Sequence, residues 1–261
     1  MSQIELQHIT FGYGKDPLFC DLSVQIAEGE FCAIVGHNGS GKTTLLKCIA
    51  GLLSVNSGQV IVNGRVLKDY TTRELATQVA YVPQRQELVF DISVFDMVMM
   101  GRNPYQRQWQ LANSQDDAIV EEMLEKCNLS HLRDRSVNEL SGGEMQRTLI
   151  ARAMAQQTPI MLLDEPLSNL DIAHKFEIMD ILQRLNRERN VLVVIILHDF
   201  PIALEYASHA LLMRSGSVLQ HDVVKTVLSP ENIRSCFDLS ERFVISGEGF
   251  VTKDVGVETL D

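Results

Sequence analysis

The sequence lacks any apolar run long enough to cross a bilayer. Its longest purely apolar stretch is Val191–Leu197, whereas a transmembrane helix needs about 20 apolar residues. No basic segment followed by an apolar one opens the chain, so no secretory signal is expected. We therefore expect a protein that is soluble on its own and that reaches a membrane only through a partner.

The sequence also lacks paired cysteines and basic runs. Its five cysteines include no C-x-x-C pair, which predicts reduced and mostly buried thiols in the cytosol. The net charge is −11 and no dense Lys/Arg run occurs, so nucleic acid is not expected as a partner, although a local basic face stays open. Hydrophobic residues make up 45% and charged residues 22% of the 261 positions, which predicts a globular fold with an extended core.

What is present is an alternation of strands and helices. Phe31–Val35 and Ile160–Leu163 are nearly all apolar, as in strands buried on both faces. Helices are predicted from about 42 to 50 and from 142 to 155. Such alternation predicts a parallel sheet, and the mainly helical residues 85–157 read as an insertion in that α/β core.

Two finer patterns give testable expectations about burial. Near the N-terminus, Ile4, Leu6 and His8 alternate with polar residues, which predicts one face of a strand. Residues 171–189 read as an amphipathic helix. The side chains expected to face inward from it are Ile172, Phe176, Met179, Leu182 and Leu185.

A glycine-rich segment follows the first buried strand and precedes a helix. Residues 36–43 fit G-x-x-x-x-G-K-S/T, the pattern whose backbone amides cradle nucleotide phosphates. Lys42 is predicted to reach the β- and γ-phosphates and Thr43 to hold Mg²⁺. A chance glycine-rich turn is the alternative, which the correct flanks disfavour. The predicted phosphate-binding residues are Gly36, Asn38, Gly39, Ser40, Gly41, Lys42, Thr43 and Thr44.

Two adjacent carboxylates end the strand Ile160–Leu163. Asp164 is expected beside the phosphate loop, where it holds Mg²⁺, because ligands bind at the carboxyl ends of parallel strands. Adjacent strand residues point in opposite directions, so Glu165 is expected to face the attacking water. An isolated Asp-Glu pair would be solvated surface; four apolar residues before it favour a functional role.

The segment Leu140-Ser141-Gly142-Gly143-Glu144-Met145-Gln146-Arg147 resembles the signature motif of ABC ATPases. The resemblance runs from about residue 3 to 239. Ser141 with Glu144 three residues on is also a capping-box pattern, so capping of a helix is the local alternative. In the family, this segment grips the γ-phosphate of ATP bound to the opposite subunit, which implies roles for Ser141, Gly142 and Gly143.

The same resemblance implies roles for further residues. Tyr13 resembles the aromatic that stacks on adenine, with a core aromatic as the alternative. Gln84 resembles the glutamine that senses Mg²⁺, and His198 the switch histidine that contacts the γ-phosphate. Asp171 resembles part of the loop that crosses the dimer interface, and it is also placed to cap the following helix.

The resemblance implies an α/β fold: a P-loop NTPase (RecA-like) core, an N-terminal antiparallel β subdomain and an inserted α-helical subdomain. We expect one ABC ATPase domain, with its core in residues 1–84 and 158–239, helical subdomain in 85–157 and tail in 240–261. Catalysis would rest on Glu165, His198 and Lys42, with ATP and Mg²⁺ bound. His37 replaces a common proline and Leu167 a common threonine; neither change removes a phosphate or metal ligand.

Because each chain holds one phosphate loop and one signature, the family geometry implies a homodimer with two composite sites. The segments Ile92-Ser93-Val94 and 99–105 resemble importers for ferric siderophores, haem and cobalamin. This predicts separate permease subunits, an external substrate-binding protein as an indirect partner and a location on the cytoplasmic face of the membrane. A soluble ABC ATPase unconnected to transport is the alternative. We expect a groove for the permease from Val89, Phe90, Val94, Phe95 and Met97, with packing in the core as the alternative for some of them.

Overall fold

A computed structural model describes residues 2–84, 91–106, 114–238, 243–246 and 249–252. Its strands are β1 Ser2–Phe11, β2 Phe19–Ala27, β3 Phe31–Gly36, β4 Ser57–Val62, β5 Arg65–Val66, β6 Val79–Val82, β7 Ile160–Leu163, β8 Leu192–Ile196, β9 His209–Arg214, β10 Ser217–Val223, β11 Phe243–Ser246 and β12 Gly249–Thr252. Its helices are α1 Lys42–Ile49, α2 Thr72–Leu75, α3 Val94–Met99, α4 Ser114–Lys126, α5 Gly142–Ala155, α6 Ile172–Arg189, α7 Phe200–Tyr206, α8 Val224–Val227 and α9 Pro230–Phe237.

The strand ends of the larger sheet position the candidate site. Among the described residues it has six strands in the order β10-β9-β3-β8-β7-β6. All neighbouring pairs are parallel except β9 with β10. The carboxyl ends of β3, β6, β7 and β8 therefore meet at one edge, where ligands bind in open α/β sheets.

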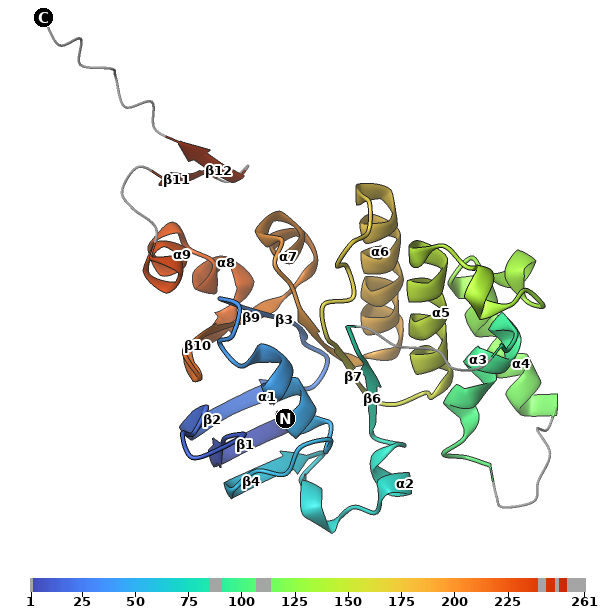
Figure 1. The fold of residues 1–261 in the computed structure, drawn as a ribbon, viewed down its shortest axis with the longest axis horizontal. Helices are drawn as coiled ribbons and strands as arrows, with labels where there is room; N and C mark the ends of the chain where they lie inside the picture. Colours follow the sequence, from blue (N-terminus) through green and yellow to red (C-terminus); the bar gives the residue numbers. More distant parts are fainter. Residues whose placement is uncertain (1, 85–90, 107–113, 239–242, 247–248, 253–261) are drawn as a thin grey trace, which may run out of the picture.

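A smaller antiparallel sheet of order β2-β1-β4-β5 covers one side of the molecule with α1 (Figure 1). The alternation expected for β1 is wrong at His8, which is exposed while Ile9 is fully buried. The cause is a β-bulge between Leu6 and Ile9, where His8 takes a φ of 51°. An extra residue in one strand of a pair shifts every later side chain to the other face.

Two apolar clusters form the core on the two faces of the larger sheet. Ile34, Leu162 and Val194 pack with α1 and the smaller sheet, whereas Ala33, Leu163 and Ile195 pack with the helices α3 to α6. Alternate residues of each buried strand thus supply both clusters, as the continuous apolar runs predicted. Figure 1 shows α3, α4 and α5 gathered at the end of the molecule away from the smaller sheet.

The burial expected for α6 is confirmed in part. Met179, Leu182 and Leu185 are buried, but Ile172 is 72% exposed and Phe176 is 41% exposed. Ile172 is the first helical residue after Asp171, and the buried residues of α6 begin only at Ile178. Periodicity fixes which side of a helix is apolar. Packing against other elements decides how much of that side is buried.

The predicted permease groove after Gln84 is wrong for two of its residues. Val94 and Met97 are buried in the core of the helical segment, at 0% and 1% exposure. Phe95 is partly buried, with the Arg133 guanidinium 4.0 Å from its ring centroid. Val89 and Phe90 lie outside the described residues. In the described part of the chain, no helix is both long and apolar enough to span a bilayer.

Candidate nucleotide site

The phosphate loop lies between β3 and α1, as predicted. Gly41 occupies the N-cap position of α1 with a φ of 100°, a conformation that residues with a Cβ rarely adopt. A Cβ at Gly41 would come within 2.6 Å of the Phe19 ring, so the loop also needs glycine for space. No side chain caps α1, which leaves its first amides directed to the loop.

Lys42 and Ser40 carry polar atoms into this loop. The Lys42 ammonium donates to the backbone oxygens of Gly36 at 2.9 Å and His37 at 2.8 Å. Burial lowers the pKa of Lys42, while the Glu165 and Asp164 carboxylates oppose that shift. Ser40 is buried, and among the described residues its Oγ has no hydrogen-bond partner. A buried unpaired hydroxyl beside unpaired amides fits a phosphate oxygen.

Asp164 connects the phosphate loop to the strand ends. Its backbone amide donates to the carbonyl of Val82 at 2.9 Å. Its Oδ1 accepts from the Thr43 hydroxyl at 2.8 Å, and its Oδ2 accepts from the Tyr81 hydroxyl at 3.1 Å. Sequence reasoning missed Tyr81, although its position in the strand before Gln84 was a usable signal. The carboxylate is thus 3% exposed and held by two hydroxyls from different elements.

Glu165 joins the ends of three neighbouring strands. Its Oε2 accepts from Gln84 Nε2 at 2.7 Å, and its Oε1 lies 2.8 Å from His198 Nε2. The carboxylates of Asp164 and Glu165 thus have different partners, and strand alternation is not the reason, since β7 ends at Leu163. Glu165 takes a φ of 48°, which turns the chain away from the strand. A residue with a Cβ at positive φ is uncommon and often marks a functional turn.

Tyr13 lies at the surface beside the loop and not in the core. Tyr13 is 70% exposed. Its ring packs edge-on against the Phe11 ring, with 5.1 Å between the two centroids. The Tyr13 hydroxyl lies 3.2 Å from the hydroxyl of Thr44, which is itself buried. An exposed aromatic face anchored at its far end is suited to stacking.

The signature segment forms the start of α5. The predicted capping box is confirmed: Ser141 Oγ accepts from the Glu144 amide, and Glu144 Oε2 accepts from the Ser141 amide at 2.7 Å. A Cβ at Gly143 would come within 2.6 Å of the His174 ring. At Gly142, by contrast, no atom of the described residues beyond its chain neighbours and the backbone of its own helix lies within 4 Å of such a Cβ. Gly143 therefore serves packing, and Gly142 leaves backbone open to an approaching group.

Asp171 is held beside this segment. It caps α6 by accepting from the His174 amide at 3.0 Å, and its Oδ2 lies 2.8 Å from His174 Nδ1. Capping of α6 by Asp171 is therefore confirmed. In the described part of the chain, no hydrogen bond or ion pair joins residues 140–147 to residues 36–44. The segment 140–147 and the phosphate loop are therefore not joined by polar contacts within one chain.

The helix α9 also reaches the phosphate loop, a contact that no pattern in the sequence predicted. The Phe237 ring lies 4.5 Å from the His37 ring and 5.4 Å from the Phe200 ring, measured between centroids. His37 belongs to the phosphate loop, and Phe200 begins α7 two residues after His198. Phe237 thus packs against both sides of the candidate site.

A glycine-rich loop between a buried strand and a helix, with carboxylates at the next strand end, defines a P-loop nucleoside triphosphatase. The family model described as ABC transporter matches residues 19–168. The chain belongs to the ABC transporter family, and it is an ATP-binding cassette that hydrolyses ATP.

Named proteins of the same family are similar to the chain over almost its whole length. The ferric enterobactin transport ATP-binding protein FepC of Escherichia coli (strain K12) is 35% identical over 92% of this chain and 88% of its own. The iron(3+)-hydroxamate import ATP-binding protein FhuC of Bacillus subtilis (strain 168) is 31% identical over 94% of this chain and 91% of its own.

Solved structures agree with the fold. An inward-facing putative metal-chelate type ABC transporter matches with a TM-score of 0.81 and 29% identity, over 97% of this chain and 96% of its own. A dimeric ATP-binding cassette in a post-hydrolysis state, bound to ADP and Pi, matches with a TM-score of 0.75 and 27% identity, over 85% of this chain and 98% of its own. The expected ABC ATPase fold is confirmed.

Proposed function

We propose that this chain is the ATP-hydrolysing subunit of an importer that takes up an iron–siderophore, haem or cobalamin-type substrate through separate permease subunits. Two observations support the proposal. The phosphate loop and the signature segment are separate on one chain, so each can supply half of an ATP site. The cassette is also similar to proteins named for ferric enterobactin transport and iron(3+)-hydroxamate import. The second candidate, a soluble ABC ATPase outside transport, has the same nucleotide chemistry but needs no permease.

ATP would lie along the start of α1. Tyr13 stacks on the adenine, since its ring is exposed and anchored through Thr44. The amides of Gly39, Gly41 and their neighbours surround the phosphates, and Ser40 Oγ donates to a phosphate oxygen. Lys42 exchanges its two backbone acceptors for the β- and γ-phosphates. The remaining proposed phosphate-binding residues are Gly36, Asn38, Thr43 and Thr44.

The oxygens of Thr43, Asp164 and Gln84 are suited to Mg²⁺, because this ion prefers octahedral oxygen ligands and retains water. Thr43 and Asp164 are already 2.8 Å apart, and Gln84 is tied to the neighbouring Glu165. When bound, Mg²⁺ neutralises charge on the β- and γ-phosphates. The chain's own residues supply its position.

Glu165 and His198 act on the attacking water and on the γ-phosphate. Glu165 Oε1 is the carboxylate oxygen that orients the water, after His198 Nε2 has moved from it to the γ-phosphate. Gln84 retains its bond to Oε2 and so fixes the carboxylate plane. Lys42 stabilises the charge that develops on the transferred phosphoryl group.

A second copy of the chain completes each site. The signature residues Ser141 and Gly142 present a helix N-terminus with open space in front of it, which suits the γ-phosphate of ATP held by the partner. Gly143 and Asp171 set this surface through their contacts with His174. Two ATP molecules close the homodimer, and hydrolysis releases the contacts that hold it closed.

The hydroxyl of Tyr81 is expected to position Asp164 for Mg²⁺. We predict that Tyr81→Phe raises the Mg²⁺ concentration needed for half-maximal ATPase activity by about ten- to a hundredfold, because a hydrogen bond to a charged group contributes about 1.5–3 kcal/mol. Steady-state hydrolysis at varied Mg²⁺ measures this. Tyr70→Phe is the matched control, since the Tyr70 hydroxyl donates to the Val62 carbonyl at 2.9 Å. Equal Mg²⁺ dependence in both variants would remove Tyr81 from the site.

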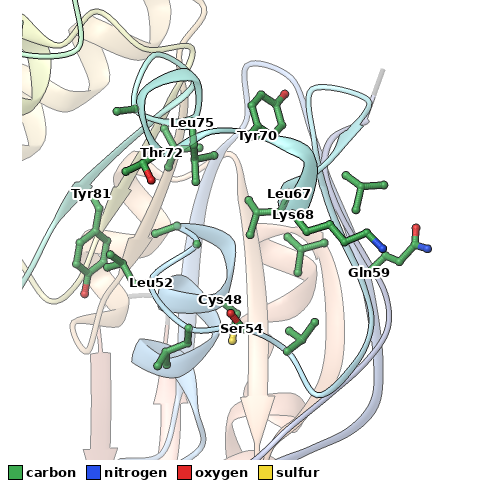
Figure 2. A pocket seen from close by; sticks show the side chains of 18 of the residues that line it. Cys48, Leu52, Ser54, Gln59, Leu67, Lys68, Tyr70, Thr72, Leu75 and Tyr81 are labelled. Carbon is green, nitrogen blue, oxygen red and sulfur yellow. The ribbon is translucent and has the colours of Figure 1, made fainter.

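The permease would dock at a cavity of about 650 Å³ beside α1 and α2 (Figure 2). Leu52, Leu67 and Leu75 line it, and Leu52 is 58% exposed. The cavity is not the nucleotide site, but Tyr81 lies in its wall and donates to Asp164. A segment seated there would reach the Mg²⁺ ligands through one side chain. This surface replaces the groove expected from Val94 and Met97.

Leu52→Glu is expected to abolish uptake while leaving the ATPase activity of the isolated cassette within about twofold, since a carboxylate resists burial against an apolar partner. Cells lacking the native gene would be complemented with each variant and supplied with iron-loaded siderophores, haem or cobalamin. Leu219→Glu, at a leucine that is 49% exposed on β10, is the control.

Two outcomes separate the proposals. If Leu52→Glu supports full uptake, the docking surface is wrong. If deletion of the gene changes uptake of none of the three substrate classes, the import function is wrong while the ATPase assignment stands. The cargo itself is recognised by the permease and an external binding protein.

We further propose that the chain works as one domain on the cytoplasmic face of the cell membrane, held there by the permease. Residues 1–84 and 158–239 form the nucleotide-binding core, residues 85–157 form the helical subdomain, and residues 240–261 form a tail. Support for the helical subdomain is that α3, α4 and α5 pack mainly on one another.

A further inference from the structure

A group of chemically unlike side chains meets at the end of β3 opposite the phosphate loop. Glu30 precedes β3 and Cys32 lies two residues on, so both point to the same face of the sheet. Cys32 is paired in register with His209 of β9, and His209 with Val223 of β10, which places His221 on that face too. The large sheet thus brings Glu30, which directly precedes β3, together with one residue from each of three strands, Cys32, His209 and His221.

The polar atoms of this group are close. One ligand atom each from Glu30, Cys32 and His221 lie within 4.8 Å of one another, the one such group of three among the described residues. Glu30 Oε2 is 3.1 Å from His221 Nε2 and 3.9 Å from His209 Nδ1. Glu30 Oε1 accepts from the Ala27 amide at 2.9 Å, which fixes the carboxylate with Oε2 turned to the histidines.

The burial of the group is graded from one side to the other. Cys32 is fully buried, and the Glu30 side chain is 10% exposed. The side chains of His221 and His209 are 16% and 31% exposed, so solvent reaches the group past the two rings. A cation that enters from this side would reach the Cys32 thiol and the Glu30 carboxylate.

We propose that Glu30, Cys32 and His221 bind a divalent transition cation of the zinc class, with His209 beside them, its Nδ1 3.9 Å from Glu30 Oε2. Thiolate, imidazole and carboxylate together are the ligand types of tetrahedral zinc, with bonds of about 2.0–2.3 Å. Ligand atoms around such an ion lie about 3.3–3.8 Å apart. The three ligand atoms lie within 4.8 Å of one another, so binding draws them closer by about 1 Å. Binding displaces the Cys32 thiol proton to solvent.

The site is separate from the nucleotide. Cys32 stands four residues before Gly36, about 13 Å along an extended strand. Its cation would tie the turn after Ala27 to β9 and β10. The binding is therefore expected to stabilise the fold and to be independent of ATP.

Co²⁺ is the probe, because it replaces zinc and reports thiolate ligation by colour. The purified full-length protein, free of nucleotide, is titrated with Co²⁺ and followed by absorption. One ion per chain, a thiolate-to-cobalt charge-transfer band and intense visible bands of a tetrahedral site are expected. Zn²⁺ should bleach these bands and raise Tm by a few degrees.

Two variants and two matched controls decide the result. Cys32→Ala should abolish the charge-transfer band, and His221→Gln should weaken Co²⁺ binding by more than about tenfold while keeping an amide near Glu30. His8→Gln alters the exposed histidine paired with Asp21 at 2.6 Å, and Cys20→Ala removes the exposed thiol; both should bind as the parent does. Circular dichroism and ATP binding check that each variant folds.

The proposal is overturned if the parent gives no charge-transfer band, or if the band survives in Cys32→Ala. It is also overturned if His221→Gln and His8→Gln reduce Co²⁺ affinity equally. In each of these cases the group is a structural Glu30–His221 hydrogen bond with a buried thiol beside it.

Discussion

Glu165→Gln is expected to reduce ATP turnover by about 10²–10⁴-fold, the range that general-base residues contribute. Glutamine keeps the shape of the side chain and the acceptor for Gln84 Nε2, which lies 2.7 Å from Glu165 Oε2. It loses the negative charge that orients the attacking water. Binding of ATP should remain within about threefold of the parent, because no phosphate ligand is changed. Phosphate release and a fluorescent ATP analogue measure the two quantities.

The same variant should accumulate as a dimer in the presence of ATP, since the bound nucleotide is no longer cleaved. Glu122→Gln is the matched control: Glu122 also has two side-chain partners, Lys126 at 2.9 Å and Arg189 at 2.7 Å, but it lies on α4, in the helical segment. It should hydrolyse ATP as the parent does. Parental turnover in Glu165→Gln would show that another residue orients the water.

Ser141→Arg is expected to abolish the ATP-dependent dimer and to lower turnover by about 10²–10³-fold, comparable to loss of an oxyanion donor. The arginine side chain would fill the open space before Gly142 and take the place of the partner's γ-phosphate. Binding of ATP to the phosphate loop of the same chain should persist, because no hydrogen bond or ion pair joins the two segments in the described residues. Light scattering of the variant in the Glu165→Gln background measures the dimer.

The change also removes a helix cap, which contributes about 1 kcal/mol. Thr71→Arg controls for this, since Thr71 and Glu74 form the same capping box at α2. That variant should retain the ATP-dependent dimer at a similar loss of stability. If Ser141→Arg still dimerises with ATP, the signature of one chain does not close the site of another.

The contacts of Glu165 are long-range in sequence, whereas the cap at Ser141 is local. The bond between Glu165 and Gln84 joins residues 81 positions apart, and the contact of Glu165 with His198 adds a third strand end. The resemblance to ABC ATPases suggested Gln84, Glu165 and His198. The parallel register of β6, β7 and β8 brings these three residues together. The capping box of Ser141, in contrast, spans three residues, and its spacing alone predicted it.

The sequence by itself determined the features that depend on near neighbours along the chain. The strand Ile160–Leu163, the helix Gly142–Ala155 and the caps at Ser141 and Asp171 were predicted with their observed bounds. Apolar periodicity, glycine and capping residues act over a few positions, so a linear pattern contains them.

Tertiary structure alone decided the rest. The bond from Tyr81 to Asp164, the packing of Phe237 on His37 and the meeting of Glu30 with His221 each join residues far apart in sequence, 191 positions in the last case. The bulge at His8 and the exposure of Ile172 and Phe176 were also missed. Strand register and helix cover are set by packing against distant segments, and one shifted residue turns a side chain to the other face.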